Sequence, residues 1–296
     1  GNNLAGNVMY GIELGVLYRG ERELCFLPLA HAYSCAFNFL VPMAVGAHVY
    51  LLGKVPSPKI LLKAFEEVKP NLILTVPLIL EKIYKKMILP QLSKTTMKVA
   101  LNIPLLDSRI YAQIRKKLVD AFGGRFREVI VGGAAMNEEV TNFLYKIKFP
   151  FTIGYGMTEC GPLISYDHND EYVPGSCGQI LKGIMKVRID SEDPYNKVGE
   201  IQVSGENVMK GYYKNEEATS KVFTEDGWLR TGDLGTIDAD NRIYIRGRSK
   251  TMILGASGQN IYPEEIESKL NNLPFVMESI IIEKNGKLVG LVYPDY

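Results

Sequence analysis

The heptapeptide GYGMTEC, at positions 154–160, combines residue types that suit a bound nucleotide. Its two glycines let a flat ligand approach the backbone closely, and the ring of Tyr155 between them can lie against a base. Thr158 can donate a hydrogen bond to a phosphate oxygen, and Glu159 can bind a divalent ion. These roles converge on a nucleotide. A Gly-Tyr-Gly turn is also common as an ordinary tight loop, so the stretch alone leaves both interpretations open.

A carboxylate and a group of cations follow later in the chain. In GWLRTGDLG (227–235), Asp233 can accept hydrogen bonds from both hydroxyls of a ribose, or it can cap an exposed turn. In IYIRGRSK (243–250), Arg248 can reach a phosphate, or it can end a solvated strand. Each of these stretches has an ordinary structural interpretation when it is taken alone.

Histidine and cysteine are scarce. His31 lies among apolar residues in LPLAHAYS, where a lone histidine is typically a core residue with satisfied hydrogen bonds. The four cysteines show no CxxC spacing and, with three histidines in all, predict no metal-ligand cluster. We expect free thiols in a reducing compartment. The residues concerned are His31, His48 and His168, and Cys25, Cys35, Cys160 and Cys177.

The elements that must position these residues alternate between strand and helix in the first half of the chain. NLILTV (71–76) and REVIVGG (127–133) are typical of buried strands, the second ending in glycines where a strand would meet a ligand. Between them, residues 107–122 place apolar side chains on one helical face, and Gly123 and Gly124 end the helix. This alternation predicts a largely parallel α/β sheet with helices.

The pattern changes after residue 160. MKVRID, GEIQVS and RIYIRG are short strands separated by turn clusters, which predicts a small β-rich sheet or barrel-like subdomain. From Lys250 a strand TMIL, a glycine loop and a helix PEEIESKL beginning at Pro263 follow. We expect a small α+β C-terminal domain to start there.

Composition excludes several partners. The chain of 296 residues has 34 Lys and Arg against 33 Asp and Glu, so no basic field for nucleic acid is expected. Its longest apolar stretch, 35–45, is shorter than the roughly 20 residues of a membrane-spanning helix. We therefore expect a cytoplasmic protein without a transmembrane segment, and peripheral contact with a membrane stays open.

The sequence contains, in order, VGGAAM (131–136), GYGMTE, GEIQVSGENVMKGYYKN (199–215), GWLRTGDLG and GRSKTMILGASGQNIYPEEIE (247–267). These five motifs resemble the core motifs of the acyl-adenylate-forming (AMP-binding) superfamily, and two further stretches, PLAHAYS and NVMKGYYKN, most resemble its long-chain fatty acyl-CoA synthetase branch. The likeness covers nearly the whole chain. It implies that residues 1–249 are the main part of the AMP-binding domain without its N-terminal portion (α/β 1–160, β-rich 161–249), and that 250–296 begin a C-terminal lid domain.

The resemblance implies a reaction in which a fatty acid attacks the α-phosphate of ATP, giving acyl-AMP and pyrophosphate, after which CoA displaces AMP. It implies a nucleotide site, with Mg²⁺ on Glu159 and Asp233 at the ribose hydroxyls. The catalytic residues that it implies are Thr158, Glu159, Arg248 and His31. His31 would lie beside the acyl and phosphate groups. The nucleotide-binding set implied is Gly133, Ala134, Gly154, Tyr155, Gly156, Met157, Thr158, Asp233, Ile245 and Arg248, with Gly258 at the pantetheine channel.

Two departures from the family pattern stand beside these matches. The Ser/Thr/Gly phosphate loop ending in Pro-Lys-Gly and the C-terminal Gly-Lys motif are not in the sequence, and Lys250 stands where the family has its hinge. We therefore expect a piece truncated at both ends, with impaired turnover. An acyl-carrier-protein synthetase, another adenylate-forming ligase and a catalytically incompetent nucleotide-binding module remain alternatives. Acyl chain length, the acceptor thiol and the oligomeric state stay open.

Overall fold

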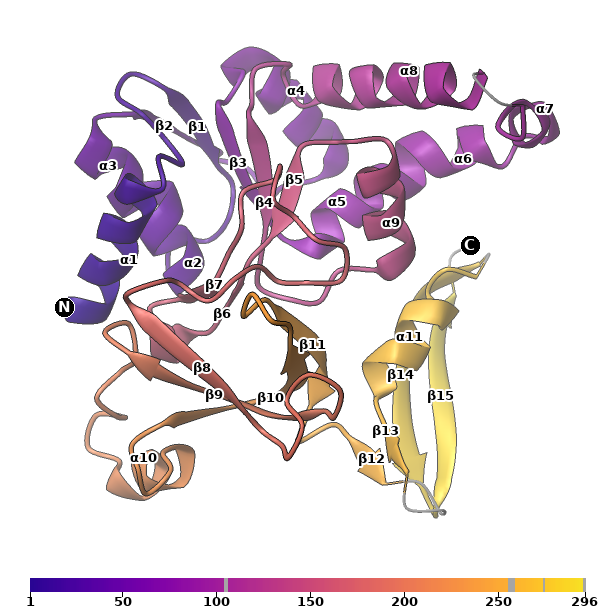
Figure 1. Ribbon diagram of the computed structural model, residues 1–296. Coiled ribbons are helices and arrows are strands. Elements are labelled where there is room, and N and C mark those ends of the chain that lie inside the picture. The colour runs from indigo at the N-terminus through magenta and orange to yellow at the C-terminus, as the bar shows by residue number, and fades with distance from the viewer. Residues whose placement is uncertain (104–105, 255–258, 274, 295–296) are drawn as a thin grey trace. The chain divides into compact units, whose positions relative to one another are not determined.

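The protein is described by a computed structural model for residues 1–103, 106–254, 259–273 and 275–294 (Figure 1). The chain forms two compact units, each interrupted once in sequence. Unit 1 comprises Gly1–Ile184 and Glu206–Met209, and unit 2 comprises Met185–Gly205 and Lys210–Tyr296. Because each unit has its own sheet, we describe them separately.

Unit 1 is built on a parallel five-stranded sheet of order β2-β1-β3-β4-β5. The predicted strands 71–76 and 127–133 are confirmed, and both are short, largely apolar strands whose residues are all buried, as expected for the interior of a parallel sheet. The strands are β1 (Arg22–Cys25), β2 (His48–Leu51), β3 (Leu72–Thr75), β4 (Glu128–Val131) and β5 (Phe151–Ile153).

Helices cover both faces of this sheet, and the larger core lies on one of them. Alternate strand residues, among them Ile73, Val129 and Phe151, belong to this core, where the rings of Phe65 and Phe122 stack with centroids 5.1 Å apart. The core helices are α4 (Pro58–Val68), α5 (Pro77–Ile83), α8 (Leu106–Ala121) and α9 (Glu138–Lys146).

The helix expected over 107–122 is α8, displaced by one residue. Its apolar face lies in the core, with Ile114, Leu118 and the following Phe122 buried. The chain then turns through Gly123 and Gly124 at φ of 92° and 71°, a region that glycine adopts without strain. The amphipathic pattern and the glycine stop were therefore sufficient to predict this element.

The remaining elements of unit 1 include short helical turns, two of them π-helical, and a two-stranded ribbon. They are α1 (Asn2–Glu13), α2 (Ala32–Ser34), η1 (Cys35–Leu40), α3 (Val41–Val45), η2 (Tyr84–Ile88), α6 (Leu89–Leu92), α7 (Thr95–Ala100), β6 (Tyr155–Gly156), the 3₁₀ turn η3 (Thr158–Cys160) and β7 (Leu163–Ser165). Helix α1 packs against η1 and α3, on the sheet face opposite the larger core.

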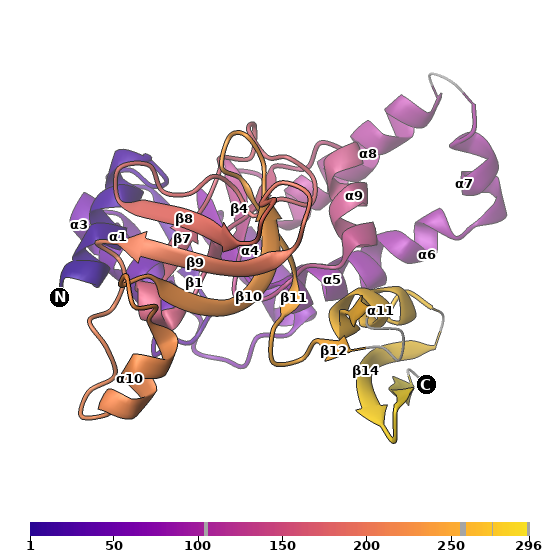
Figure 2. The same ribbon diagram turned by 60° about the horizontal axis from the view of Figure 1, so that its bottom comes forward.

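Unit 2 contains an antiparallel sheet of order β11-β10-β9-β8, with β8 and β11 as its edges (Figure 2). It is thus an open sheet in the described part of the chain rather than a closed barrel. A small α+β portion follows, and its helix α11 (Pro263–Leu270) has the predicted bounds. The elements are β8 (Met185–Asp190), β9 (Gly199–Gly205), α10 (Glu216–Val222), β10 (Leu229–Ile237), β11 (Ile243–Arg248), β12 (Ile253–Leu254), β13 (Asn260–Ile261), α11, β14 (Val276–Lys284) and β15 (Lys287–Pro294).

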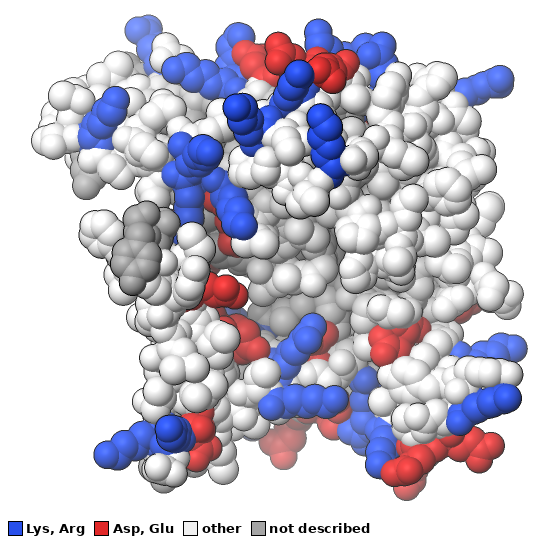
Figure 3. Space-filling model, turned by 180° about the vertical axis from the view of Figure 1, so that it is seen from behind, with Lys and Arg blue, Asp and Glu red and all other residues white. Residues whose placement is uncertain are grey.

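The surface carries charges of both signs, in keeping with a formal net charge of +1. On the face shown in Figure 3, basic and acidic side chains occur in both the upper and the lower half. Within the described residues, no helix is both long enough and apolar enough to cross a lipid bilayer.

Candidate functional site

The carboxyl edge of the parallel sheet in unit 1 brings two of the predicted stretches together. The amide of Gly132 donates to the carbonyl of Thr75 (3.1 Å), and the amide of Gly154 donates to the carbonyl of Val131 (3.0 Å). The chain therefore leaves β4 and β5 side by side, with VGGAAM after one strand and GYGMTEC after the other. Gly133 has a φ of 88°, which a residue with a side chain would adopt only with strain. Ligands of open α/β sheets bind at such an edge.

Beyond β5 the GYGMTEC segment folds back on itself. The Met157 amide donates to the carbonyl of Pro162 (2.9 Å), and a Cβ placed on Gly156 would lie 2.3 Å from that carbonyl oxygen. Gly156 is therefore required for the approach of the protein's own backbone, whereas the sequence suggested the approach of a ligand. The segment ends as η3, whose last residue is followed by Gly161 in the left-handed conformation.

The side chains of this turn differ in exposure. Tyr155 is 6% exposed, so most of its ring is already covered by protein. Thr158 is exposed and Glu159 is partly exposed, and the Glu159 carbonyl accepts a hydrogen bond from the amide of Met209 (2.7 Å). A hydroxyl and a carboxylate thus stand next to each other at the surface of the turn, as a contact with a phosphate and its cation requires.

A buried side chain that the sequence did not reveal holds this turn. Asn7 in α1 is completely buried, and its Nδ2 donates to the carbonyls of Asn3 (2.7 Å) and Cys160 (3.0 Å). Its Oδ1 accepts from the amide of Leu163 (2.8 Å). One amide group therefore ties α1 to both sides of the Gly161 turn. In sequence, the only signal is an asparagine within a helical stretch, which does not identify its partners.

His31 follows the carboxyl end of β1 and precedes α2 as its N-terminal flanking residue. Its side chain is exposed, so the interpretation of His31 as a core histidine is wrong. The reason is local, because the segment from Pro28 to His31 closes a turn (His31 amide to Pro28 carbonyl, 3.0 Å) at the edge of the sheet rather than beneath it. The histidine is thus available for a role at that edge.

In unit 2, two of the predicted residues meet. Asp233 in β10 lies directly opposite Arg248 in β11, and the Arg248 Nε is 3.2 Å from the Asp233 Oδ1. The Asp233 side chain is 12% exposed and that of Arg248 is 70% exposed. Thr231 fixes the backbone at Asp233, because the Thr231 Oγ1 accepts a hydrogen bond from the Asp233 amide (3.1 Å) and donates one to the Ile201 carbonyl (2.8 Å). The two ionic groups can therefore act on one ligand.

The other predicted residues of unit 2 lie on or after the same strand. Ile245 is partly exposed in β11 and pairs with Gly235. Lys250 is exposed in the turn that follows β11. Gly258, predicted at a pantetheine channel, lies outside the described residues.

The donor set is compatible with a phosphate-bound magnesium ion. Among the residues that the structure describes, no group of three or more His, Cys, Asp or Glu side chains is placed to hold a metal by itself. Magnesium usually keeps several waters and is held by one or two carboxylates together with substrate phosphates. The single carboxylate of Glu159 beside the hydroxyl of Thr158 fits such an ion.

Comparison with known proteins identifies the family of this chain. The family model described as AMP-binding enzyme matches residues 2–213. The chain is 28% identical to long-chain-fatty-acid–CoA ligase 1 of Saccharomyces cerevisiae and 31% identical to 4-coumarate–CoA ligase CCL1 of Humulus lupulus, over 93% of its own length in both cases. These alignments cover 43% and 46% of the two relatives, so the chain spans less than half the length of the curated relatives it matches.

Solved structures agree with this match. The ATP-bound structure of MatB from Rhodopseudomonas palustris has a TM-score of 0.77 at 25% identity, covering 99% of this chain and 54% of that one. O-succinylbenzoate CoA synthetase (MenE) from Bacillus subtilis with ATP and magnesium has a TM-score of 0.72 at 25% identity, covering 98% and 54%. The predicted resemblance is confirmed, and the chain belongs to the family of AMP-binding enzymes.

Proposed function

We propose that this chain is a large part of an ATP-dependent, AMP-forming fatty acid:CoA ligase. In the first step a carboxylate oxygen of the fatty acid forms a bond to the α-phosphorus of ATP, and the bond to the leaving pyrophosphate breaks. In the second step the sulfur of CoA bonds to the acyl carbon, the thiol proton is lost and AMP leaves. The products are acyl-CoA, AMP and pyrophosphate.

The residues of unit 1 would hold the base and phosphates. In this proposal Gly133 and Ala134 frame one side of the adenine and Tyr155 the other, while Thr158 donates to the α-phosphate. Glu159 holds Mg²⁺, which supplies charge neutralisation for the phosphates when bound. The exposed imidazole of His31 stands beside the reacting carboxylate.

The residues of unit 2 would hold the sugar. Asp233 accepts hydrogen bonds from the ribose hydroxyls and Arg248 contacts the ribose or a phosphate. The pairing of these two side chains supports the proposal most directly. It presents an acceptor and a cationic donor 3.2 Å apart on adjacent strands, which suits a ribose phosphate and is unnecessary for an exposed turn.

Fatty acids are the proposed acids because the relatives include long-chain-fatty-acid–CoA ligases from yeast and bacteria. The hop relative is named for 4-coumarate and one of the bacterial structures for o-succinylbenzoate, so a panel of acids is needed. The direct test is isotope exchange between pyrophosphate and ATP with fatty acids, 4-coumarate and o-succinylbenzoate. Exchange with fatty acids above the other acids supports the proposal, and exchange only with another acid overturns it.

Nucleotide binding is tested separately from turnover. Titration calorimetry with AMP measures whether the chain holds the nucleotide, whatever its catalytic rate. If AMP binds and no acid supports exchange, the nucleotide site stands and the ligase activity of this chain does not.

A further inference from the structure

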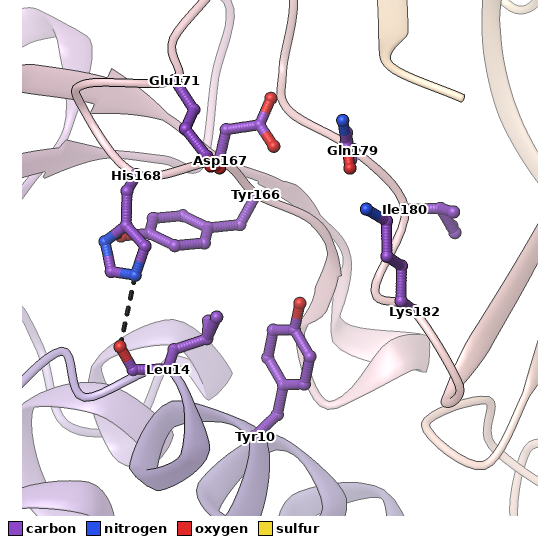
Figure 4. A pocket seen from close by; sticks show the side chains of 9 residues that line it. All are labelled: Tyr10, Leu14, Tyr166, Asp167, His168, Glu171, Gln179, Ile180 and Lys182. Atoms are coloured by element: carbon purple, nitrogen blue, oxygen red, sulfur yellow. Dashed lines mark hydrogen bonds between the residues drawn. The ribbon is translucent and has the colours of Figure 1, made fainter. Parts of the chain in front are cut away.

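Tyr166, which follows β7, lies between two cavities of unit 1. The inner cavity has a volume of about 20 Å³ and is lined by apolar side chains, among them Phe37, Leu72, Leu74 and Ile130. The outer cavity has a volume of about 170 Å³ and is shown in Figure 4. Both cavities share two wall residues, Leu14 and Tyr166. These two side chains are therefore a partition between them.

The inner cavity lies along the sheet face opposite the larger core. Successive residues of a strand face opposite sides, and Ile73 and Val129 belong to the larger core. Leu72, Leu74 and Ile130 must then face the other side, where they line the inner cavity.

One end of the inner cavity is close to the carboxyl edge of the sheet. Tyr33 lines it, its hydroxyl donates to the Ile130 carbonyl (3.1 Å), and its ring lies 3.4 Å from where a Cβ on Gly132 would be. Gly132 adjoins Gly133 in the loop proposed to frame adenine. The inner cavity thus begins near the proposed site of acyl transfer and extends toward Tyr166.

The Tyr166 ring is held from the amino end of β4. Its hydroxyl donates to Glu128, which is 3% exposed, and lies 3.0 Å from His168 Nδ1. His168 Nε2 lies 3.2 Å from the Leu14 carbonyl, which can only accept. Because the Tyr166 hydroxyl donates its proton to Glu128, it can only accept a hydrogen bond from His168 Nδ1. The Leu14 carbonyl likewise accepts from Nε2, so both imidazole nitrogens donate. His168 is then an imidazolium, 3.6 Å from the Glu128 carboxylate.

The protonation states agree with this network. The Glu128 carboxylate raises the pKa of His168 above its ordinary value, although burial opposes the shift. Burial alone would raise the pKa of Glu128, but hydrogen bonds from His168, Tyr166 and Asn169 hold it below its ordinary value. Both shifts favour the charged form of the group, in keeping with the hydrogen bonds that hold the ring, and the Asn169 backbone amide donates to the same carboxylate (2.7 Å).

The outer cavity is polar. Figure 4 shows the Tyr10 hydroxyl, the Asp167 carboxylate, the Gln179 amide and the Lys182 ammonium directed toward one space beside the Tyr166 ring. Moving an apolar group into such a lining would remove water from polar groups without replacing its hydrogen bonds. The Tyr166 ring blocks the passage of an apolar group from the inner to the outer cavity, and the polar lining of the outer cavity makes that passage unfavourable.

We propose that Tyr166 sets the upper length of the acyl chain that this protein accepts, which limits the substrates to short chains. The chain enters the inner cavity from the carboxyl edge, and its terminal methyl group meets the Tyr166 ring. Glu128 and His168 are positioning residues that act through the ring. A cavity of about 20 Å³ has room for only one or two water-sized groups, whereas the space behind the ring has room for about ten. The proposal rests on the proposed function.

The test measures binding of stable acyl-adenylate mimics, acyl sulfamoyl adenosines from butanoyl to hexadecanoyl, by calorimetry on the complete 296-residue chain. Each methylene that enters an apolar cavity should tighten binding about fourfold, up to the length limit beyond which added methylenes no longer help. Tyr166→Ala should move this limit by at least two methylenes, which makes the first even-numbered homologue beyond it roughly fifteenfold tighter. Glu128→Gln should move the limit in the same direction by less.

The matched control is Tyr172→Ala. Tyr172 and Tyr166 are both 5% exposed, but Tyr172 packs against Phe151 in the larger core. This control should leave the limit unchanged. If Tyr166→Ala does not fold, Tyr166→Val removes the ring with a smaller loss of volume.

The outcomes separate the two proposals. If wild type binds neither AMP nor any mimic, the proposed function fails. If AMP and the short mimics bind and the limit is the same in wild type and in the folded Tyr166 variant, only the role of Tyr166 is overturned. A limit that moves in the Tyr172 control as much as in the Tyr166 variant also overturns it.

Discussion

Asp233 and Arg248 face each other across β10 and β11, with Nε 3.2 Å from Oδ1. This pair predicts the order of two substitutions. Two charge-assisted hydrogen bonds to a ribose contribute about 1.5 to 3 kcal/mol each, against roughly 0.5 to 1.5 kcal/mol for a ring on a base. Asp233→Ala should therefore weaken AMP binding at least as much as Tyr155→Ala, by about 100-fold or more, in titration calorimetry.

The matched control for Asp233 is Asp240→Ala. Asp240 is an exposed aspartate in the turn between the same two strands, so its removal should leave the affinity for AMP unchanged. A larger loss of affinity in Tyr155→Ala than in Asp233→Ala would contradict the ribose assignment.

Lys250 should behave as a hinge residue in a form of the protein that carries out both half-reactions. The side chain is exposed in a turn after β11, and a hinge depends on backbone freedom more than on a side chain. Lys250→Pro should spare formation of acyl-AMP and block release of the thioester, whereas Lys250→Ala should spare both. Rapid-quench measurement of each half-reaction checks this, and equal loss of both in the proline variant argues against a hinge.

Asn7→Ala should destabilise unit 1 and disturb the GYGMTEC turn. The substitution leaves the Cys160 carbonyl and the Leu163 amide buried without their partner, at about 1 to 3 kcal/mol for each group. Denaturant unfolding should show a loss of roughly 2 to 6 kcal/mol, and AMP should bind more weakly. Asn2→Ala, at an exposed position of the same helix, is the control. Unchanged stability of the Asn7 variant would contradict the role given to this side chain.

Glu23 should make the protein less stable as pH rises. It is completely buried in β1, accepts one bond from Asn38 Nδ2 (2.6 Å) to Oε1, and its Oε2 has no partner among the described residues. Burial, opposed by the Asn38 hydrogen bond, raises the pKa of Glu23 from 4.5 to about 8. Between these values the folded state holds a proton that the unfolded state has released, so stability falls with pH, and below 4.5 the effect is absent.

The variant Glu23→Gln measures this effect directly. Its stability relative to wild type should increase by about 1.4 kcal/mol per pH unit across that window, as followed by urea unfolding at several pH values. Glu67→Gln, an exposed glutamate, should show no comparable trend. A difference between Glu23→Gln and wild type that is constant with pH would show that Glu23 ionises normally in the folded state.

Local patterns predicted the elements well. The apolar run at 71–76, the helical face of Ile114 and Leu118 and the start of α11 at Pro263 each follow from neighbours in sequence. The contact between Asp233 and Arg248 has an equally local cause, because strands joined by a short turn are adjacent. These are all interactions over short distances along the chain.

Contacts between distant residues could not be predicted in this way. Asn7 and Cys160 are 153 positions apart, and Glu128 and Tyr166 are 38 apart, with nothing in either local sequence to name the partner. His31 shows the same difficulty in reverse. Its apolar neighbours in sequence favoured a buried position. In the structure, however, the turn after β1 places His31 at the edge of the sheet, where its side chain is exposed.

The hydrogen bonds of the His168 imidazolium can be observed directly through the ¹⁵N chemical shifts of its ring. A ring that donates from both nitrogens, to Tyr166 and to Leu14, has ¹⁵N chemical shifts distinct from either neutral tautomer, and His31 and His48 are the only other histidines. Any ligand that displaces the Tyr166 ring must change one of those two hydrogen bonds. Occupancy next to this ring can thus be followed by nuclear magnetic resonance without adding a label at the wall of the cavity.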